Sequence, residues 1–391
     1  RAGQIISERY KMTTAYRIAG QLEMAADFLS ENTLTSVRFS WRNSLPRPGD
    51  AVRVGKEFEI KRLQKIPSQE ALDALPKIFR MALSPPDVLF SSVAAILCAA
   101  PDRVNEVLSL AHDCEVWEKG TGDDDLVYGL RWSGSKGTGE ITKWLIPSMA
   151  SVVQEAIEKI RRVTSEARTI AIWYEENPHD LYLPDEMEYL RNKDLSMLEV
   201  AEIIGLSGAE SSSRQWCKNN KVSLISMDTG YVARFSDVER AILRYLPASF
   251  PYVDHGHSLR FSDALFVVQR NGMHMQRGTY RCMIEPVTTD QINSGFGSRV
   301  RHGFPSIFTR LGFAALDGSP LKVTSHQFRH YLNTLAQSGG MSQLDIAKWS
   351  GRIDIRQNEV YDHMSAQDML AQIREAAGNE KNISGSLAKI S

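Results

Sequence analysis

The residues best suited to chemistry lie towards the C-terminal end of this 391-residue chain. His326 and Arg329 stand three residues apart, so on a helix both side chains would share one face. Arg352 follows Gly351 further along the chain, and Tyr361 comes nine residues after Arg352. An imidazole, two guanidinium groups and a phenol in this order suit a reaction at a phosphate ester.

A second group of charged residues lies upstream. Arg103 and Glu106 stand three residues apart directly after an apolar segment. Lys136 lies in a Gly- and Ser-rich turn between two predicted strands, and Lys143 in the second of these strands is the alternative for its role. Alone, Arg103 would more often be a salt-bridge partner and Tyr361 a core tyrosine, but their joint occurrence favours a catalytic set.

Together these residue types fit the attack of an oxygen nucleophile on a phosphodiester. Negative charge builds on the non-bridging oxygens in this reaction, and two arginines can bind those oxygens bidentately. A lysine on a flexible turn can protonate the leaving oxygen, and a histidine can hold or relay a proton. A tyrosine can attack and keep the phosphoryl group as a covalent ester, which conserves the bond energy for religation. Because the arginines neutralise the charge, the reaction needs no metal.

With these motifs the sequence resembles the catalytic domain of the tyrosine recombinases of the phage-integrase type. Pro-Asp-Arg-Val-Asn-Glu matches the family's GxRxxE-like helix, and His-Gln-Phe-Arg matches its HxxR motif. The resemblance is strongest over residues 68–147 and 320–364. The resemblance implies one supporting acid, Glu106, and the catalytic residues Arg103, Lys136, His326, Arg329 and Tyr361.

Two departures from the family stand out. The family usually has His or Trp nine residues before the tyrosine, where this chain has Arg352. A guanidinium can donate to a phosphate oxygen but cannot accept a proton. Trp349 is the alternative for this position, and we favour Arg352. The stretch between Lys136 and His326 is also far longer than in the family, and an inserted segment accounts for much of the excess.

The inserted segment, residues 186–262, has the pattern of a small module. Helix, turn, helix, hairpin and helix follow one another over 194–246, which is the order of a winged helix-turn-helix. The segment is similar to excisionase or MerR-type DNA-binding modules, whose second helix enters the major groove. The similarity therefore predicts DNA contacts from Arg214, Gln215 and Lys218. A small helical domain that contacts protein is the alternative.

The hydrophobic pattern predicts a mainly α fold with small antiparallel sheets, in the α+β class. Apolar residues recur at three- and four-residue spacing in most segments, and two alternating runs flank the Gly-rich turn. The expected helices outside the module cover 10–32, 69–83, 88–100, 103–112, 152–163, 288–311, 325–339, 344–350, 357–363 and 366–377. The expected strands outside the module cover 127–132, 141–146 and 264–269.

We expect the chain to have four parts. Residues 1–66 would be the tail of a core-binding domain with a basic linker, since they carry 12 Lys and Arg against 7 Asp and Glu. The catalytic domain would cover 67–185 and 263–391, with the module 186–262 inserted between its two parts. The resemblance implies that the core-binding and catalytic domains form a clamp around duplex DNA.

The composition is ordinary for a globular protein. Hydrophobic residues make up 42% and charged residues 24%, which excludes a disordered or collagen-like chain. The apolar runs are too short to span a bilayer and no secretory signal is present, so we expect no membrane partner. The net charge of −1 argues mildly against a nucleic-acid protein, but the local field decides binding. The four scattered cysteines indicate reduced thiols in a cytoplasmic protein and no zinc site.

The resemblance implies a site-specific DNA recombinase, the integrase or transposase of a mobile element. Tyr361 would attack the scissile phosphate, form a 3′-phosphotyrosyl link and release a 5′-hydroxyl. Arg103 and Arg329 would hold the phosphate and Lys136 would protonate the leaving oxygen. His326 would assist proton movement. The 5′-hydroxyl of a partner strand would then attack, so that strands exchange through a Holliday junction.

The resemblance also implies the partners. These would be double-stranded DNA and further copies of the chain, in a homotetramer on two recombination sites with exchange of the C-terminal helix. Accessory proteins of the element are candidate partners, no cofactor is implied, and the protein would be associated with the bacterial nucleoid. Two alternatives stay open: a type IB topoisomerase, which relaxes DNA by the same chemistry, and a DNA-binding regulator with reduced catalysis.

Overall fold

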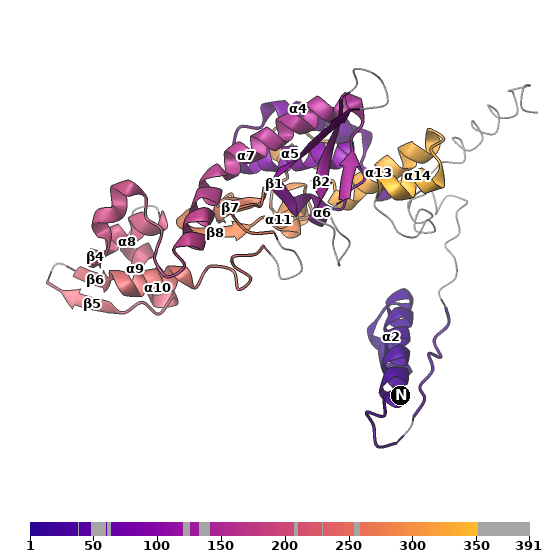
Figure 1. Ribbon diagram of the computed structural model, residues 1–391, viewed down its shortest axis with the longest axis horizontal. Helices are drawn as coiled ribbons and strands as arrows, with labels where there is room; N and C mark the ends of the chain where they lie inside the picture. The colour runs from indigo at the N-terminus through magenta and orange to yellow at the C-terminus, as the bar shows by residue number, and fades with distance from the viewer. Residues whose placement is uncertain are drawn as a thin grey trace, which may run out of the picture. The chain divides into compact units, whose positions relative to one another are not determined.

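Figure 1 shows the computed structural model of the chain, which describes residues 1–37, 39–47, 60, 64–119, 126–132, 141–206, 210–228, 230–253 and 259–350. Lys136, Arg352 and Tyr361 lie outside the described residues, as do the helices expected at 357–363 and 366–377. The chain divides into two compact units, Arg1–Glu59 and Ile60–Ser391. The described part consists mostly of helices with small antiparallel sheets, which confirms the predicted class.

The described part of the first unit contains two helices, α1 (Ala2–Arg9) and α2 (Met12–Glu31). Ile6 of α1 packs with Ala15 and Ala19 of α2 in a small core. The small alanine side chains let the two helices approach closely. The helix predicted for this stretch is confirmed as α2.

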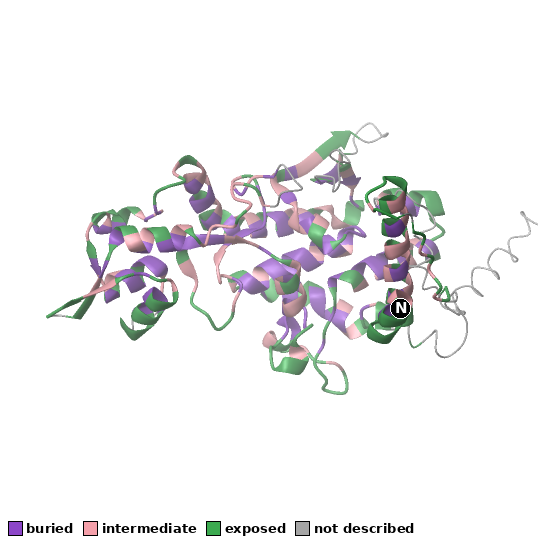
Figure 2. Cartoon of the chain, turned by 90° about the horizontal axis from the view of Figure 1, so that it is seen from below, coloured by how far each residue is buried: buried purple, intermediate pink, exposed green. Residues whose placement is uncertain are grey.

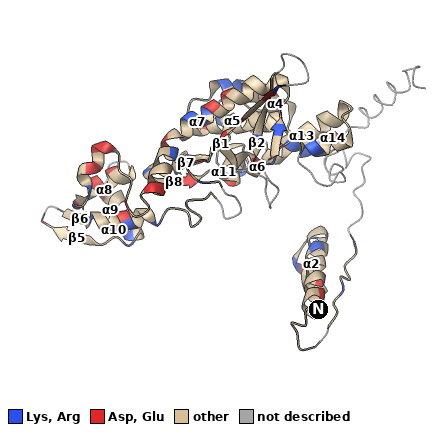
Figure 3. Cartoon of the chain, viewed as in Figure 1, with Lys and Arg blue, Asp and Glu red and all other residues tan. Residues whose placement is uncertain are grey.

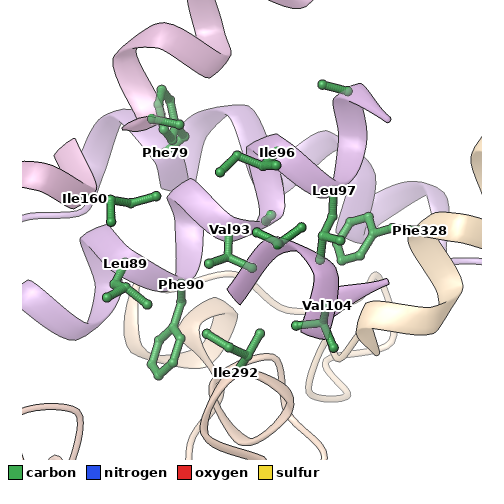
Figure 4. Packing of buried hydrophobic residues seen from close by; sticks show 14 of the residues in the cluster. Phe79, Leu89, Phe90, Val93, Ile96, Leu97, Val104, Ile160, Ile292 and Phe328 are labelled. Carbon is green, nitrogen blue, oxygen red and sulfur yellow. The ribbon is translucent and has the colours of Figure 1, made fainter. Parts of the chain in front are cut away.

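Two helices, α4 (Gln69–Met81) and α5 (Pro85–Ala99), form the centre of the second unit. Each begins at a serine whose hydroxyl accepts a backbone N–H of the first turn, Ser68 for α4 and Ser84 for α5. α5 is apolar and buried on almost every face, so other elements surround it. Figure 4 shows its side chains packed among residues from five other segments: Phe79, Val104, Ile160, Ile292 and Phe328.

A three-stranded antiparallel sheet lies next along the chain, in the order β1-β2-β3. Its strands are β1 (Leu110–Lys119), β2 (Leu126–Trp132) and β3 (Ile141–Trp144). β2 and β3 pair in register from Gly129 opposite Trp144 to Trp132 opposite Ile141. The hairpin predicted from the alternating runs is confirmed.

The helix predicted over 103–112 is wrong. It is only one short element, α6 (Val104–Leu108), and His112 lies in β1 instead. The pairing of β1 with β2 shifts register between Leu110 and Glu115, so this pairing is irregular where the helix was expected. Contacts with a distant strand therefore decide the conformation here, and local spacing could not show them.

The helix predicted over 152–163 is much longer in the structure. α7 (Pro147–Glu176) has 30 residues, which correspond to about 45 Å of helix. Its C-terminal half packs against a two-stranded sheet of β7 (Val267–Arg270) and β8 (Tyr280–Pro286). The Tyr174 hydroxyl donates to the backbone carbonyl of residue 282 at 2.7 Å. The predicted strand 264–269 is displaced to β7, and β8 was not predicted.

The single helix predicted over 288–311 is also wrong. Three short elements replace it: α11 (Thr289–Gly295), η3 (Val300–His302) and α12 (Ile307–Arg310). Gly297 and Gly303 between them have positive φ angles of 108° and 81°, which only glycine adopts easily. These two glycines therefore interrupt the helix although the apolar spacing continues across them.

The last described helices are α13 (Ser325–Ser338) and α14 (Gln343–Trp349), which confirm the predictions for 325–339 and 344–350. A capping box begins α13, where the Gln327 side chain accepts the Thr324 backbone N–H at 2.7 Å. The Gln327 amide also donates to the backbone carbonyls of residues 64 and 66, at 3.2 and 3.0 Å. These bonds join α13 to the chain just before α4.

The inserted segment has its own core, in which Val200, Trp216 and Ile242 are buried. Figure 2 colours the buried positions of the chain purple. Its sheet has the order β4-β6-β5, and two of its helices precede the β5–β6 hairpin. Its elements are η2 (Asp185–Leu190), β4 (Asp194–Ser196), α8 (Met197–Ile204), α9 (Glu210–Asn219), β5 (Leu224–Met227), β6 (Gly230–Arg234) and α10 (Phe235–Leu243). The helices and the hairpin predicted over 194–246 are confirmed, whereas the four-part domain division stays a prediction.

Candidate active site

Arg103 and Glu106 lie together at the start of α6. One Glu106 oxygen, Oε2, accepts the backbone N–H of Arg103 at 3.0 Å, and the other, Oε1, accepts from Arg103 Nη1 at 2.7 Å. The backbone bond caps the first turn of the helix, so Glu106 fixes both the helix start and the arginine head. The Arg103 side chain is 46% exposed and remains accessible to a ligand.

Arg329 approaches the same carboxylate from α13. It is one of the largest fully buried side chains, and its Nη1 lies 3.9 Å from Glu106 Oε2. Its Nη2 donates to the backbone carbonyl of Ser350 at 3.1 Å. Figure 3 marks the Lys and Arg positions of the chain in blue, with α6 and α13 labelled. Two arginines that are far apart in sequence therefore meet at one acid.

A short hydrogen-bond chain fixes α13 against the end of α14. The Ser350 hydroxyl donates to Asn333 Oδ1 at 3.1 Å, and Asn333 Nδ2 donates to the Arg329 carbonyl at 2.6 Å. All three residues are buried. The last described residue, Ser350, is thus held directly beside the Arg329 guanidinium. Trp349, the alternative for the Arg352 position, is partly buried on the final turn of α14.

Lys143 on β3 is the lysine that the described structure brings to this site. Its ammonium forms an ion pair with Asp102 and lies 3.2 Å from Glu106 Oε2. The ring centroid of Trp132 is 5.0 Å from the same ammonium, and Lys143 is 7% exposed. Lys136, the first choice from the sequence, lies outside the described residues.

Asp102 was missed by the sequence reasoning. It is 1% exposed, and one of its carboxylate oxygens pairs with Lys143. Burial raises the pKa of this carboxyl, and the neighbouring Lys143 opposes the rise. The available signal was the position of Asp102 between an apolar segment and Arg103. An acid beside an apolar segment can be buried, and a buried acid needs a cationic partner.

Glu106 stays ionised in this environment. Burial alone would raise its pKa, but Lys143, the two bonds to Arg103 and the charge of Arg329 together outweigh it and lower the pKa. Three cations therefore face two acids, so the cluster of Asp102, Arg103, Glu106, Lys143 and Arg329 is positive. A positive cluster with one exposed guanidinium is suited to bind an anionic oxygen.

His326 lies one turn before Arg329 on α13. Burial lowers its pKa, and the positive charges of Arg329, Arg103 and Lys65 lower it further. The imidazole is therefore neutral near pH 7 and able to accept a proton. The ring of His330, on the same helix, meets it edge-to-face with centroids 4.5 Å apart.

The predicted DNA contacts of the inserted module share the exposed face of α9. Arg214, Gln215 and Lys218 are all exposed, while Trp216 on the opposite face is buried. The Arg214 guanidinium stacks on the ring of Tyr231 in β6, 4.3 Å from its centroid. Polar and basic side chains are thus available on this helix and on the adjoining hairpin.

Among the described residues, no helix has both the length and the apolar character that crossing a bilayer requires. Within the ranges that the structure describes, no three His, Cys, Asp or Glu side chains gather as ligands for a metal ion.

Comparison with known proteins gives structural likenesses only. No family model matches the chain, and no curated protein matches it. One similar structure is the XerH site-specific recombinase bound to palindromic difH substrate in a post-cleavage complex, with 12% identity and a TM-score of 0.43 over 97% of this chain and 71% of that chain.

Two other solved structures are similar to a lower degree. The pre-cleavage complex of XerH with difH substrate has 12% identity and a TM-score of 0.40, over 98% of this chain and 69% of that chain. The XerA recombinase has 13% identity and a TM-score of 0.32, over 96% of this chain and 79% of that chain. All three are described as recombinases.

Proposed function

We propose that this chain is a DNA strand transferase of the tyrosine recombinase family, with Tyr361 as its nucleophile. The observation that most supports the proposal is the meeting of Arg103 and Arg329 at Glu106. Two guanidinium groups fixed in this way suit the two non-bridging oxygens of a phosphodiester. His326 lies on α13 with Arg329, and its neutral imidazole would accept the proton in such a reaction.

The first half of the reaction forms the covalent intermediate. The Tyr361 hydroxyl oxygen attacks phosphorus as its proton moves to His326. The bond between phosphorus and the 5′-oxygen breaks, and Lys136 gives that oxygen a proton, so a 5′-hydroxyl leaves. Arg103, Arg329 and Arg352 bind the non-bridging oxygens as their charge increases. The phosphoryl group remains as a 3′-phosphotyrosyl ester.

The second half reverses these steps with a different strand. The 5′-hydroxyl of a partner duplex attacks the 3′-phosphotyrosyl phosphorus, and the Tyr361 oxygen leaves and regains a proton. In this proposal four copies assemble on two sites, exchange their C-terminal helices at 366–377 and pass through a Holliday junction. The chain would act on double-stranded DNA as the integrase or transposase of a mobile element, in the bacterial cytoplasm.

The inserted module would bind DNA through α9. Arg214, Gln215 and Lys218 stand on one exposed helix face, which is the arrangement of a helix that reads the major groove. Removing Arg214 and Lys218 together should weaken binding of duplex DNA and reduce its salt dependence. Arg240→Ala is the matched control, because Arg240 is an exposed arginine of the same module on another helix. Equal loss for control and variant would contradict this role of α9.

A suicide-substrate assay tests the main proposal. Nicked duplexes spanning the ends of the DNA element that encodes the chain are incubated with the protein in EDTA. Cleavage near the nick releases a short strand that diffuses away, so the covalent adduct is trapped and survives SDS. We expect the adduct with the wild type and its absence with Tyr361→Phe.

The matched control is Tyr331→Phe, which changes a partly buried tyrosine on α13 two residues after Arg329. This variant should still form the adduct. Tight binding without any adduct would favour the regulator, whereas relaxation of a supercoiled plasmid that lacks the element ends would favour a topoisomerase.

A further inference from the structure

A buried acid directly before Arg103 stands apart from the catalytic set already described. Asp102 is 1% exposed and forms an ion pair with Lys143, whose side chain is 6% exposed. The family motif that the sequence resembles contains the arginine and Glu106 but not this pair. Asp102 and Lys143 come from different elements, the segment before α6 and strand β3.

Stability alone does not account for this pair. Two charges lose their hydration when they are buried, and an apolar pair of the same size often serves the fold as well or better. One side of the pair is apolar, with Ala100 fully buried and Trp132 3% exposed, and the other side faces Glu106 and Arg329. Burial alone does not favour an ionic pair here, so its explanation lies on the charged side.

The contacts of Lys143 provide that explanation. Its ammonium reaches Glu106 Oε2 at 3.2 Å while it is paired with Asp102. The same Glu106 oxygen accepts the backbone N–H of Arg103 at 3.0 Å and lies 3.9 Å from Arg329 Nη1. One oxygen atom thus links the lysine to both arginines of the proposed phosphate clamp.

We propose that Asp102 and Lys143 are a positioning pair: Asp102 holds Lys143, Lys143 fixes the Glu106 carboxylate, and Glu106 orients Arg103 and Arg329 for the phosphate. This inference rests on the proposed strand-transferase function. The proposal also gives different roles to Lys136 and Lys143, the two lysines of the hairpin region. Lys143 is a positioning residue because its ammonium is buried against two carboxylates, whereas the leaving oxygen receives its proton from another group, for which Lys136 is the candidate.

The test compares two substrates that differ in one atom. One nicked duplex carries the ordinary 5′-oxygen at the scissile bond, and the other carries a bridging 5′-sulfur. A thiolate leaves without a proton because thiols have a pKa of roughly 8.5, far below that of an alcohol. Loss of a proton donor is therefore rescued by sulfur, and loss of a positioning residue is not.

Single-turnover rates of adduct formation are measured with saturating protein. We expect Lys143→Met to slow the reaction about ten- to a hundredfold, and equally on both substrates. This is the range known for residues that orient the protein ligands of a metal ion. Lys136→Ala should be slow on the oxygen substrate only. Rescue of Lys143→Met by sulfur would identify Lys143 as the proton donor and overturn the proposal.

A second variant keeps the test valid if Lys143→Met unfolds. The double variant Asp102→Leu with Lys143→Met replaces both charges, so neither partner of the pair stays buried and unpaired, and it should unfold at a higher temperature than Lys143→Met. Its adduct formation should still be slow on both substrates. A double variant as fast as the wild type would mean that the pair is merely structural.

The matched control is Lys159→Met, which changes another lysine that is packed on an aromatic ring, 3.7 Å from the centroid of Phe79. Lys159 donates to a backbone carbonyl on α4 and pairs with Glu155, and among the described residues it has no ion pair or hydrogen bond with Arg103, Glu106 or Arg329. It should form the adduct at the wild-type rate. If the wild type itself forms no adduct on either substrate, the proposed function fails, and this result is distinct from a fast double variant.

Discussion

Replacing Glu106 by glutamine tests how far one carboxylate organises the candidate active site. The change keeps the size of the side chain but removes its charge. Three cations, Arg103, Lys143 and Arg329, then lose their shared acceptor. The glutamine amide has only one acceptor oxygen, and its N–H₂ group would face donors.

The contacts give the size of the expected effect. The Arg103 side chain is 46% exposed, so solvent screens its bond to Glu106. This bond therefore contributes little to the free energy of unfolding. The contact with the buried Lys143 ammonium and the bond from the Arg103 backbone N–H are not screened in this way. A hydrogen bond to a charged group contributes about 1.5–3 kcal/mol, so we expect a loss of about 2–3 kcal/mol in the free energy of unfolding. In a unit of about 330 residues this loss corresponds to about 3–4 °C in the unfolding midpoint.

The effect should depend on pH in a defined direction. The pKa of Glu106 is lower in the folded chain than its ordinary value of 4.5. A lowered pKa means that the carboxylate stabilises the fold fully above the unfolded value and loses this contribution as pH falls through the folded value. The difference between wild type and Glu106→Gln should therefore be constant near neutral pH and shrink below about pH 4.5.

Thermal unfolding of both proteins across this pH range is the assay. Glu155→Gln is the control, because Glu155 is 58% exposed and its ion pair with Lys159 at 2.9 Å lies on the surface of α7. That change should alter the free energy of unfolding by less than about 0.5 kcal/mol. A Glu106→Gln shift no larger than that of the control, or a difference that grows in acid, would refute the reasoning.

Three other predictions concern packing and burial. Arg310→Met leaves the buried Asp87 carboxylate without its guanidinium, so we expect a loss of about 3–5 kcal/mol by denaturant unfolding, most of which Asp87→Asn in the same chain should recover. Gly295→Ala would place a carbon 2.7 Å from the ring of Phe90 and should destabilise by about 1–3 kcal/mol in the same assay, whereas wild-type stability would mean that the ring moves aside. Burial raises the pKa of two thiols, Cys114 and Cys282, to about 12. At pH 8 they should react with a thiol reagent only after denaturation, and rapid labelling of both in the native protein would contradict their burial.

Local signals in the sequence predicted the elements that local interactions determine. Ser68 before an amphipathic run predicted the start of α4, and its hydroxyl accepts the N–H of Ala71. The Gly-rich turn between alternating runs predicted the β2–β3 hairpin. The short module helix α8 was predicted for the same reason, since Ser196 and Glu199 form a capping box at its start.

Long-range contacts determine the elements that were missed. β1 has a helical neighbour in sequence but pairs with β2, and β8 packs on a helix that is more than a hundred residues away. In the candidate site, the spacing of His326 and Arg329 was visible in the sequence. The role of Lys143 was not, because only the folded chain places its ammonium between Asp102 and Glu106.

The inserted module shares its core with a strand that lies outside the insertion, so it cannot be deleted by itself. Cys282 and Met283 of β8 lie outside the insertion but are buried in the module's own core, at 1% and 2% exposure. The thiol of Cys282 donates to the carbonyl of Ile203 at 3.1 Å, and its own carbonyl accepts from Tyr174 of α7. A deletion of 186–262 that closes the chain with a short linker would leave this strand with an uncovered apolar face. Any shortened version of the protein would have to redesign the outer surface of β8 together with the splice point.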